Sequence, residues 1–199
     1  MIRLIISDLS EVLVSGLYGI EVELQPILGI PQNEILPCFG GNLLTTLFVG
    51  RITEDEYLSE IISERCWPIT VEGLRETIRR NLLQSDNRAI ALVTSLAEKM
   101  DVVILSDHAR EWADFVRQNH PFLKVFERQF YSYETGFTKS DPRAFTHVLR
   151  TMRVAAEESL FIDDRMPNVE TALSVGLNTH HYTTVETLES YLVSREILG

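Results

Sequence analysis

The sequence predicts an α/β fold in which a parallel sheet carries an inserted, all-helical segment. Short apolar runs that stop abruptly at polar residues recur along the chain, as is typical of strands buried on both faces of a parallel sheet. After Asn87 such runs alternate with amphipathic segments, and strands joined through helices form parallel sheets with right-handed crossovers. Between residues 17 and 84 the pattern is helical and contains no convincing strand.

The first strand is predicted over Ile2–Ser7, a nearly continuous apolar run that ends at Asp8. The helical segment follows it. Within "ITEDEYLSEIISER", Thr53 and Glu56 have the spacing of a capping box, and apolar residues then recur at helical intervals. A second amphipathic helix is expected in "TVEGLRETIRRNLL", because its apolar residues fall on one stripe.

The second half of the chain repeats a rhythm of helix and strand. A helix after Asn87 leads into the strand "DVVILSD", and three more helices are expected at about 110–119, 142–153 and 167–175. Each of these three helices precedes a segment that carries a strand: "RQFYSYETGFTKSD", "SLFIDD" and "NTHHYT".

Bulk properties narrow the function classes. The chain of 199 residues is long enough for one well-buried domain or a domain with a smaller insertion, and its formal net charge is -11. Lys and Arg are scattered, which argues against nucleic acid or an anionic membrane as a partner. No apolar run approaches the roughly 20 residues of a membrane span, so we expect a cytoplasmic protein.

Cys38 and Cys66 are expected to be buried free thiols. The sequence carries no signal of an oligomeric state.

Polar side chains follow several of the predicted strands. Ligands of parallel sheets bind outside the carboxyl ends of the strands, where Asp8, Ser106, Asp163 and Asp164 should meet Lys139. Three carboxylates crowded at one edge repel each other, and Mg²⁺ is the usual cation that relieves such repulsion. A free carboxylate could serve as a nucleophile, while a lysine and a hydroxyl orient phosphoryl oxygens.

Other polar and aromatic residues are weaker candidates. His180 and His181 are adjacent rather than at metal-ligand spacing, so a structural or surface role is expected. Trp67, Phe39 and Tyr18 occur in the helical segment, where aromatic side chains are more often part of the core than substrate contacts.

Four segments together resemble the motifs of the haloacid dehalogenase superfamily of phosphatases and hydrolases. "IISDLSEVLV" is similar to motif one, "VVILSD" to motif two, "GFTKSDPRAF" to motif three and "FIDDRMPNVETALSVGL" to motif four. The last two are the most specific matches, and the resemblance covers essentially the whole chain. It assigns the nucleophile to Asp8, the phosphate-binding hydroxyl to Ser106 and the motif-three lysine to Lys139.

The resemblance implies a Rossmann-like hydrolase core over residues 1–16 and 86–199, with a small helical cap over residues 17–85. It also implies a metal site in which Asp8, the Ser10 carbonyl and Asp164 hold Mg²⁺, and Asp163 supports them through water. The substrate-binding residues that follow are Leu9, Ser106 and Asp107, with Asn168 and Glu11 in supporting positions.

Two positions depart from the pattern of the family. Ser10 stands where phosphatases usually have a second Asp, whose carboxyl protonates the leaving group, and its loss typically costs about 10²–10⁴-fold in rate. Glu11 is next to this gap and could substitute, but we expect it to be solvated or to cap the chain. Asp107 stands where relatives often have Asn, and its carboxylate would repel a phosphate unless it points away.

Three functions therefore compete. The leading one is a Mg²⁺-dependent phosphatase that hydrolyses a small phosphorylated metabolite through an aspartyl-phosphate at Asp8. A metal-free, dehalogenase-like hydrolase also lacks the second Asp, but that chemistry has no use for Asp163 and Asp164. The third is a slow or non-catalytic protein that binds a phosphorylated ligand, which Ser10 and Asp107 motivate.

Overall fold

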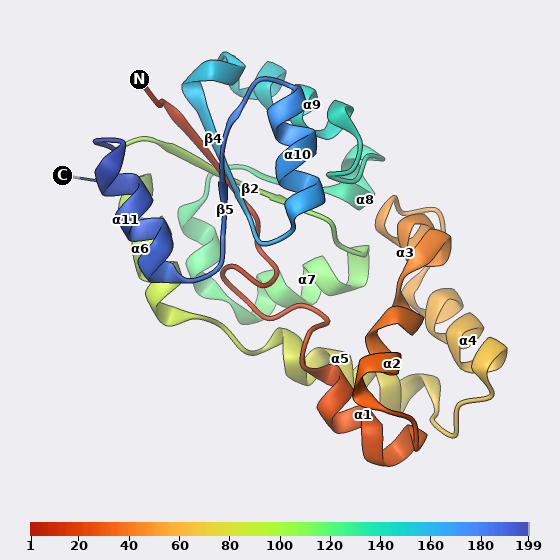
Figure 1. Cartoon of the computed structure of the whole chain (residues 1–199). Coiled ribbons are helices and arrows are strands. Elements are labelled where there is room, and N and C mark those ends of the chain that lie inside the picture. The colour runs from red at the N-terminus through yellow and green to blue at the C-terminus, as the bar shows by residue number, and fades with distance from the viewer. Residues whose placement is uncertain (199) are drawn as a thin grey trace.

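The structure is a computed structural model, and it describes residues 1–198. Its centre is a five-stranded, all-parallel sheet with the strand order β3-β2-β1-β4-β5 (Figure 1). The strands are β1 (Leu4–Ser7), β2 (Asp101–Ser106), β3 (Gln129–Tyr131), β4 (Ser159–Asp163) and β5 (Asn178–His181). The α/β fold with a parallel sheet is thus confirmed.

The central strand, β1, pairs with a strand on each side. Ile5 is in register with Val102 of β2 and with Leu160 of β4. Every residue of β1 is buried, which explains why its sequence is continuously apolar rather than alternating. The carboxyl ends of β1, β2 and β4 consequently meet at one edge of the sheet.

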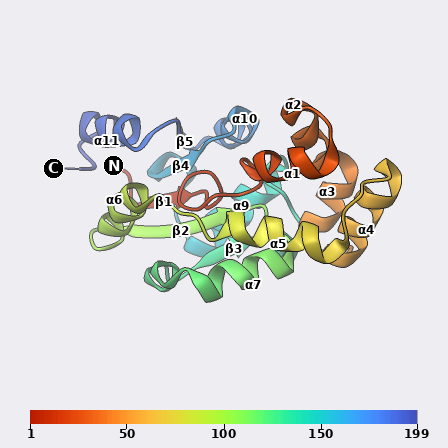
Figure 2. The same ribbon diagram turned by 90° about the horizontal axis from the view of Figure 1, so that it is seen from below.

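Only helices lie between β1 and β2. They are α1 (Ile20–Leu28), α2 (Gln32–Ile35), the 3-10 helix η1 (Leu36–Phe39), α3 (Gly41–Phe48), α4 (Glu54–Arg65), α5 (Val71–Leu82) and α6 (Asn87–Ala97). The predicted capping box is present at the start of α4, where the Glu56 backbone N–H and carboxylate bond to Thr53. Figures 1 and 2 both show α1, α2, α3 and α4 gathered at one end of the molecule, far from the C-terminus.

Two connections join this helical segment to the rest of the chain, and they run next to each other. The Ser15 N–H donates to the Gln84 carbonyl at 3.0 Å, and the Asp86 N–H donates to the Leu13 carbonyl at 3.0 Å. The boundaries that we expected for an inserted cap, at residues 16/17 and 85/86, fall at this pair of connections. The division into a core and a cap stays an interpretation of the chain.

The second half of the chain supplies the remaining helices. They are α7 (Arg110–Asn119), the 3-10 helix η2 (Pro121–Val125), α8 (Ser132–Thr135), α9 (Pro142–Met152), the 3-10 helix η3 (Ala156–Glu158), α10 (Met166–Ser174) and α11 (Val185–Ser194). In "RQFYSYETGFTKSD" only Gln129–Tyr131 forms a strand, because α8 begins directly at Ser132.

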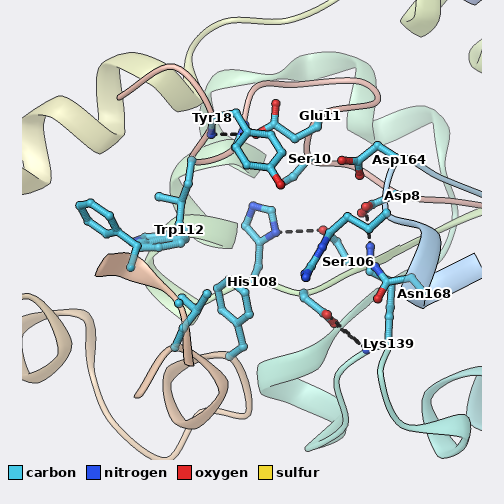
Figure 3. Close-up of a pocket in the computed structure, with 18 of the residues that line it drawn as sticks. Asp8, Ser10, Glu11, Tyr18, Ser106, His108, Trp112, Lys139, Asp164 and Asn168 are labelled. Atoms are coloured by element: carbon cyan, nitrogen blue, oxygen red, sulfur yellow. Dashed lines mark hydrogen bonds and ion pairs between the residues drawn. The ribbon is translucent and has the colours of Figure 1, made fainter. Parts of the chain in front are cut away.

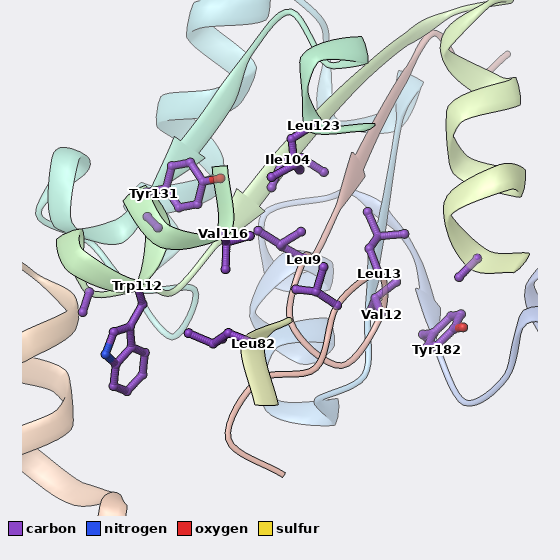
Figure 4. Packing of buried hydrophobic residues seen from close by; sticks show 14 of the residues in the cluster. Leu9, Val12, Leu13, Leu82, Ile104, Trp112, Val116, Leu123, Tyr131 and Tyr182 are labelled. Carbon is purple, nitrogen blue, oxygen red and sulfur yellow. The ribbon is translucent and has the colours of Figure 1, made fainter. Parts of the chain in front are cut away.

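The alternation of side chains along the strands divides the core into two layers. Ile5 and Ile104 pack with the apolar faces of α6, α7 and α11. Ile6 and Val103 face the opposite side and pack with α9 and α10. Figure 4 shows part of the first layer, in which Ile104 of β2 lies among Val116 of α7 and Leu123.

Two further expectations concern the cysteines and the membrane. Both thiols are free, but neither is buried: Cys38 is half-buried and Cys66 is exposed. Cys66 is the residue that ends α4, in a left-handed conformation. Within residues 1–198, every helix is too short or too polar to cross a membrane.

Candidate active site

Five predicted site residues come together at the carboxyl edge of the sheet, and Asp8, Ser106, Lys139 and Asp164 are labelled in Figure 3. Asp8 directly follows β1, Ser106 ends β2 and Asp163 ends β4, so the strands themselves position these side chains. Asp164 follows Asp163, and Lys139 arrives from the loop that precedes α9. Asp8, Ser106, Lys139 and Asp164 line one cavity of about 410 Å³, whose size is ordinary for a small-molecule site.

The buried Lys139 ammonium connects two of the carboxylates. Its Nζ lies 2.5 Å from Asp8 Oδ2 and 2.6 Å from Asp163 Oδ2. Burial alone would lower the pKa of Lys139, but the charges of Asp163, Asp8 and Asp107 raise it above its ordinary value. Lys139 therefore remains a cation at the edge of the sheet.

The pKa values of the two carboxylates next to Lys139 are shifted in opposite directions. Burial raises the pKa of Asp8 well above its ordinary value, against the attraction of Lys139, and repulsion from Asp163 and Asp164 adds to the rise. Burial also acts to raise the pKa of Asp163, but the charge and hydrogen bond of Lys139 outweigh it, so that this pKa is lowered. The single positive charge of Lys139 is therefore not enough to lower the pKa of every carboxyl group around it.

Asp163 already has protein partners on both carboxylate oxygens. The Arg165 backbone N–H donates to Oδ1 at 2.8 Å, and the Asn168 side-chain amide donates to Oδ1 and Oδ2 at 3.0 and 3.2 Å. Lys139 donates to Oδ2. The supporting position expected for Asn168 is therefore a direct hydrogen bond to Asp163.

The acids fit a divalent metal by the chemistry of their donors. One oxygen each of Asp8, Asp163 and Asp164 lies within 4.8 Å of the others. The pKa of Asp164 is raised by burial and by repulsion from Asp163, which a cation would relieve. Carboxylate oxygens without nitrogen or sulfur ligands are the donors that suit Mg²⁺.

Leu9 and Asp107 contact Asp8 and Lys139, respectively. The side chain of Leu9 is buried in the core, while its backbone N–H donates to Asp8 Oδ1 at 2.6 Å. The carboxylate of Asp107 accepts the backbone N–H of Lys139, at 3.0 and 3.2 Å to its two oxygens. Burial raises the pKa of Asp107, against the attraction of Lys139.

His108 is a site residue that the sequence reasoning missed. Its Nδ1 lies 2.9 Å from Ser106 Oγ, its ring is buried, and its Nε2 has no hydrogen-bond partner. Burial, with the nearby Lys139 charge, lowers the pKa of His108 to about 3, so the ring is neutral. Its place two residues after Ser106, just beyond the end of a strand, is the sequence signal that could have identified it.

Of the two roles expected for Glu11, solvation or capping of the chain, the structure shows the second. Its carboxylate accepts the backbone N–H groups of Gly16 at 2.8 Å and Tyr18 at 3.1 Å, and it lines the cavity. Burial raises the pKa of Glu11 to about 7. A Cβ at Gly16 would lie only 2.7 Å from Glu11 Oε1, so glycine is required for this close approach. The turn at Glu11 itself has a φ of 61°.

Of the aromatic residues that we assigned to the core, two line the cavity. Phe39 is both buried and part of the lining, whereas Tyr18 is 55% exposed above the site. Trp67 packs on Phe39 with ring centroids 5.6 Å apart and does not reach the cavity. Trp112 of α7, which the sequence reasoning did not single out, also lines it.

The two adjacent histidines have structural contacts. His181 Nε2 lies 2.8 Å from the backbone carbonyl of Asp164, and His180 packs against the Tyr191 ring. Neither belongs to the acidic cluster among the described residues. The structural role expected for them agrees with these contacts.

Comparison with known proteins identifies relatives of the chain. A family model described as haloacid dehalogenase-like hydrolase matches residues 2–176. The chain is 23% identical over 136 residues to a D-ribitol-5-phosphate phosphatase of Bacteroides thetaiotaomicron, covering 65% of this chain and 66% of the relative. It is 24% identical over 149 residues to a flavin mononucleotide hydrolase of Arabidopsis thaliana, covering 75% and 60%. A sesquiterpene phosphatase of Aspergillus oryzae is 31% identical over 84 residues, covering 42% of each.

Solved structures share the fold. A Bacteroides thetaiotaomicron enzyme of the same family, in complex with magnesium and inorganic phosphate, has a TM-score of 0.77 at 23% identity over 92% of this chain and 95% of that one. A predicted hydrolase of Porphyromonas gingivalis has a TM-score of 0.76 at 22% identity over 97% and 98%. The matches to the curated relatives span about two thirds of their lengths or less.

Proposed function

The chain belongs to the haloacid dehalogenase-like hydrolases, and from this we propose that it is a Mg²⁺-dependent phosphatase acting through Asp8. The reaction is hydrolysis of a small organic phosphate by way of an aspartyl-phosphate. One observation carries the proposal: the buried Lys139 ammonium bridges Asp8 and Asp163, next to a third carboxylate, Asp164.

The first step forms a bond between an Asp8 carboxylate oxygen and phosphorus and breaks the bond from phosphorus to the substrate's ester oxygen, which takes up a proton from solvent because Ser10 has no carboxyl to donate one. Lys139 opposes the rise that burial causes in the pKa of Asp8 and neutralises charge on the phosphoryl oxygens. The hydroxyl of Ser106 donates to a phosphoryl oxygen. His108 orients that hydroxyl, since its Nδ1 lies 2.9 Å away. Water then attacks phosphorus, which releases phosphate and regenerates Asp8.

The metal ligands that we propose are the carboxylates of Asp8 and Asp164 and the backbone carbonyl of Ser10, with Asp163 acting through water. The hydrogen bonds that already occupy both oxygens of Asp163 support this division of roles. When bound, Mg²⁺ would offset the repulsion among the acids and draw electron density from a phosphoryl oxygen.

The two alternatives lose support. A metal-free, dehalogenase-like reaction has no use for three carboxylates in one cluster. Ser10 and Asp107 are the residues that favour a protein that only binds phosphorylated ligands. The carboxylate of Asp107 accepts the backbone N–H of Lys139, which gives this residue a structural role and removes it as an argument for a binding protein. The absence of a carboxyl at Ser10 still favours slow turnover of unactivated esters.

Release of inorganic phosphate from p-nitrophenyl phosphate tests the proposal, with Mg²⁺ and with EDTA, for the wild type and Asp8→Asn. We expect turnover that needs both Mg²⁺ and Asp8. Full activity in EDTA would promote the metal-free alternative. Phosphate binding without any turnover of this activated ester would assign the chain to the binding proteins instead.

The substrate is a small phosphorylated metabolite in this proposal. The curated relatives carry names that range from a polyol phosphate to a sesquiterpene phosphate. These substrates differ widely in polarity, so the relatives do not identify the substrate of this chain. The residues that line its own cavity are the evidence for the substrate class.

A further inference from the structure

The cavity above Asp8 has two chemically different halves (Figure 3). All its charged side chains come from the sheet edge and the loops that adjoin it: Asp8, Glu11, Asp107, Lys139, Asp164 and Arg165. Ser106 and His108 belong to the same half, so the polar groups gather where the phosphate of a substrate would lie. The other half must receive the part of the substrate that leaves as an alcohol.

Residues 17–85 supply that other half, and they bring no charged side chain into it. Tyr18 is the one residue of this segment whose side chain in the lining carries a polar atom. The remaining lining residues of the segment are apolar side chains and a glycine, chiefly Leu17, Leu36, Phe39, Leu44 and Phe48.

The lining residues of this segment, together with Trp112 of α7, form the apolar wall of the cavity, and hydrogen bonds within the protein occupy two of the wall's polar groups. The indole N–H of Trp112 donates to the buried Glu54 carboxylate at 2.6 Å, so only the apolar surface of the ring remains for a ligand. The backbone carbonyl of Phe39 accepts the Tyr57 hydroxyl at 2.5 Å. Phe48 packs edge-on against Trp112 with centroids 5.8 Å apart, which fixes the wall in place.

We propose, resting on the phosphatase function above, that the preferred substrates are phosphate monoesters of largely apolar alcohols rather than sugar or polyol phosphates. A polyol would bring a hydroxyl on each carbon into a wall that offers almost no partner, and a buried hydroxyl without a partner is unfavourable. The unpartnered Nε2 of His108 lies at the phosphate half and can serve one polar atom next to the ester. An apolar chain loses no hydrogen bonds and gains contact with the wall.

A matched pair of esters tests the preference. Hexyl phosphate and sorbitol 6-phosphate have carbon chains of the same length and both release a primary alcohol, so the missing acid at Ser10 slows both. We expect kcat/KM for hexyl phosphate to exceed that for sorbitol 6-phosphate by about 100-fold, because apolar pockets discriminate against substrates with added hydroxyl groups by about this factor. Equal values, or a preference for sorbitol 6-phosphate, would overturn the inference.

Two adjacent leucines of α3 give a matched pair of variants. Leu44 lines the cavity, whereas Leu43 is half-buried against the core and does not. Leu44→Asn should lower the preference for hexyl phosphate by roughly 10-fold, and Leu43→Asn should leave it unchanged. Equal losses in both variants would mean that the wall acts only through the fold.

Acetyl phosphate separates this inference from the function on which it rests, because it has almost no leaving group to place in the apolar half. If acetyl phosphate is hydrolysed, the phosphatase function holds and the hexyl-to-sorbitol ratio decides the inference. If no ester is hydrolysed, the function fails, and calorimetric binding of the two esters to the Mg²⁺-loaded chain decides the inference alone. Tighter binding of hexyl phosphate would support it, and equal or weaker binding would refute it.

Discussion

The Lys139 ammonium lies 2.5 Å from the Asp8 carboxylate, and both side chains are almost completely buried. A charge pair without water is stable only when further polar contacts complete it, and here Asp163 supplies the second carboxylate at 2.6 Å. The charge of Lys139 acts to lower the pKa of Asp8, but burial outweighs it and the pKa stays above its ordinary value. Stability and the catalysis that we propose therefore depend on the same lysine.

Replacing Lys139 with Ala should lower kcat by about 100-fold or more, because the variant loses the charge that stabilises both Asp8 and the transferring group. It should also lower the free energy of unfolding by about 3 kcal/mol, since buried carboxylates lose their counterion. Steady-state kinetics and urea denaturation measure the two effects. Lys124→Ala removes an exposed lysine and is the control; wild-type kinetics in Lys139→Ala would contradict the assigned role.

The acidic cluster makes a prediction about metal binding. Asp164→Asn should weaken Mg²⁺ binding by roughly 10-fold or more, because a proposed ligand loses its charge, and EDTA should abolish turnover in the wild type. Isothermal titration with Mg²⁺ measures the first effect directly. Asp114→Asn, at an exposed position of α7, should bind Mg²⁺ as the wild type does. Unchanged affinity in Asp164→Asn would exclude Asp164 from the metal site.

The sheet and the acids at its edge follow from local sequence patterns. The apolar runs around Ile5 and Ile104 are continuous because their strands are buried on both faces, and a parallel sheet brings the residues after them together. Asp8, Ser106 and Asp163 could therefore be placed without knowledge of any side-chain contact.

Contacts between residues that are distant in the chain have no such local pattern in the sequence, so they could not be predicted. The Trp112 indole bonds to Glu54, which lies 58 residues earlier in the chain, and a residue pair of this kind has no local signature. Glu11 adopts a left-handed turn that usually favours glycine or asparagine, so its carboxylate could not be placed next to the Gly16 and Tyr18 amides in advance. The neutrality of His108 depends on burial that only the folded chain produces.

His108 also predicts how stability changes with pH. Its pKa is about 3 in the folded chain, against the ordinary 6.5, so the unfolded chain binds a proton that the folded chain does not. This contribution to stability is present above about pH 6.5 and is lost as the pH falls towards 3. Between about pH 6 and pH 4, stability should fall more steeply in the wild type than in His108→Gln, by about 1.4 kcal/mol per pH unit.

Urea denaturation at several pH values measures these slopes. His147→Gln, which removes an exposed imidazole on α9, is the matched control. Identical slopes for the wild type and His108→Gln would show that His108 is protonated in the folded chain.

The last prediction concerns Ser10, which lines the cavity but has no carboxyl to donate a proton. An alkoxide departs poorly without such a donor, whereas p-nitrophenolate needs little help. The wild type should therefore hydrolyse p-nitrophenyl phosphate much faster than hexyl phosphate. Ser10→Asp should raise kcat/KM for hexyl phosphate by roughly 10-fold or more and change that for p-nitrophenyl phosphate much less.

The contrast between the two esters carries this test. An equal change in both would mean that Ser10 does not stand in an empty acid position, and loss of both activities would mean that the added charge upsets the metal site. Efficient hydrolysis of hexyl phosphate by the wild type would point to another proton donor. Glu11 lines the same cavity, and burial raises its pKa to about 7, so that a proton is available near neutral pH. In that case Glu11→Gln, rather than Ser10→Asp, should change the ratio of the two rates.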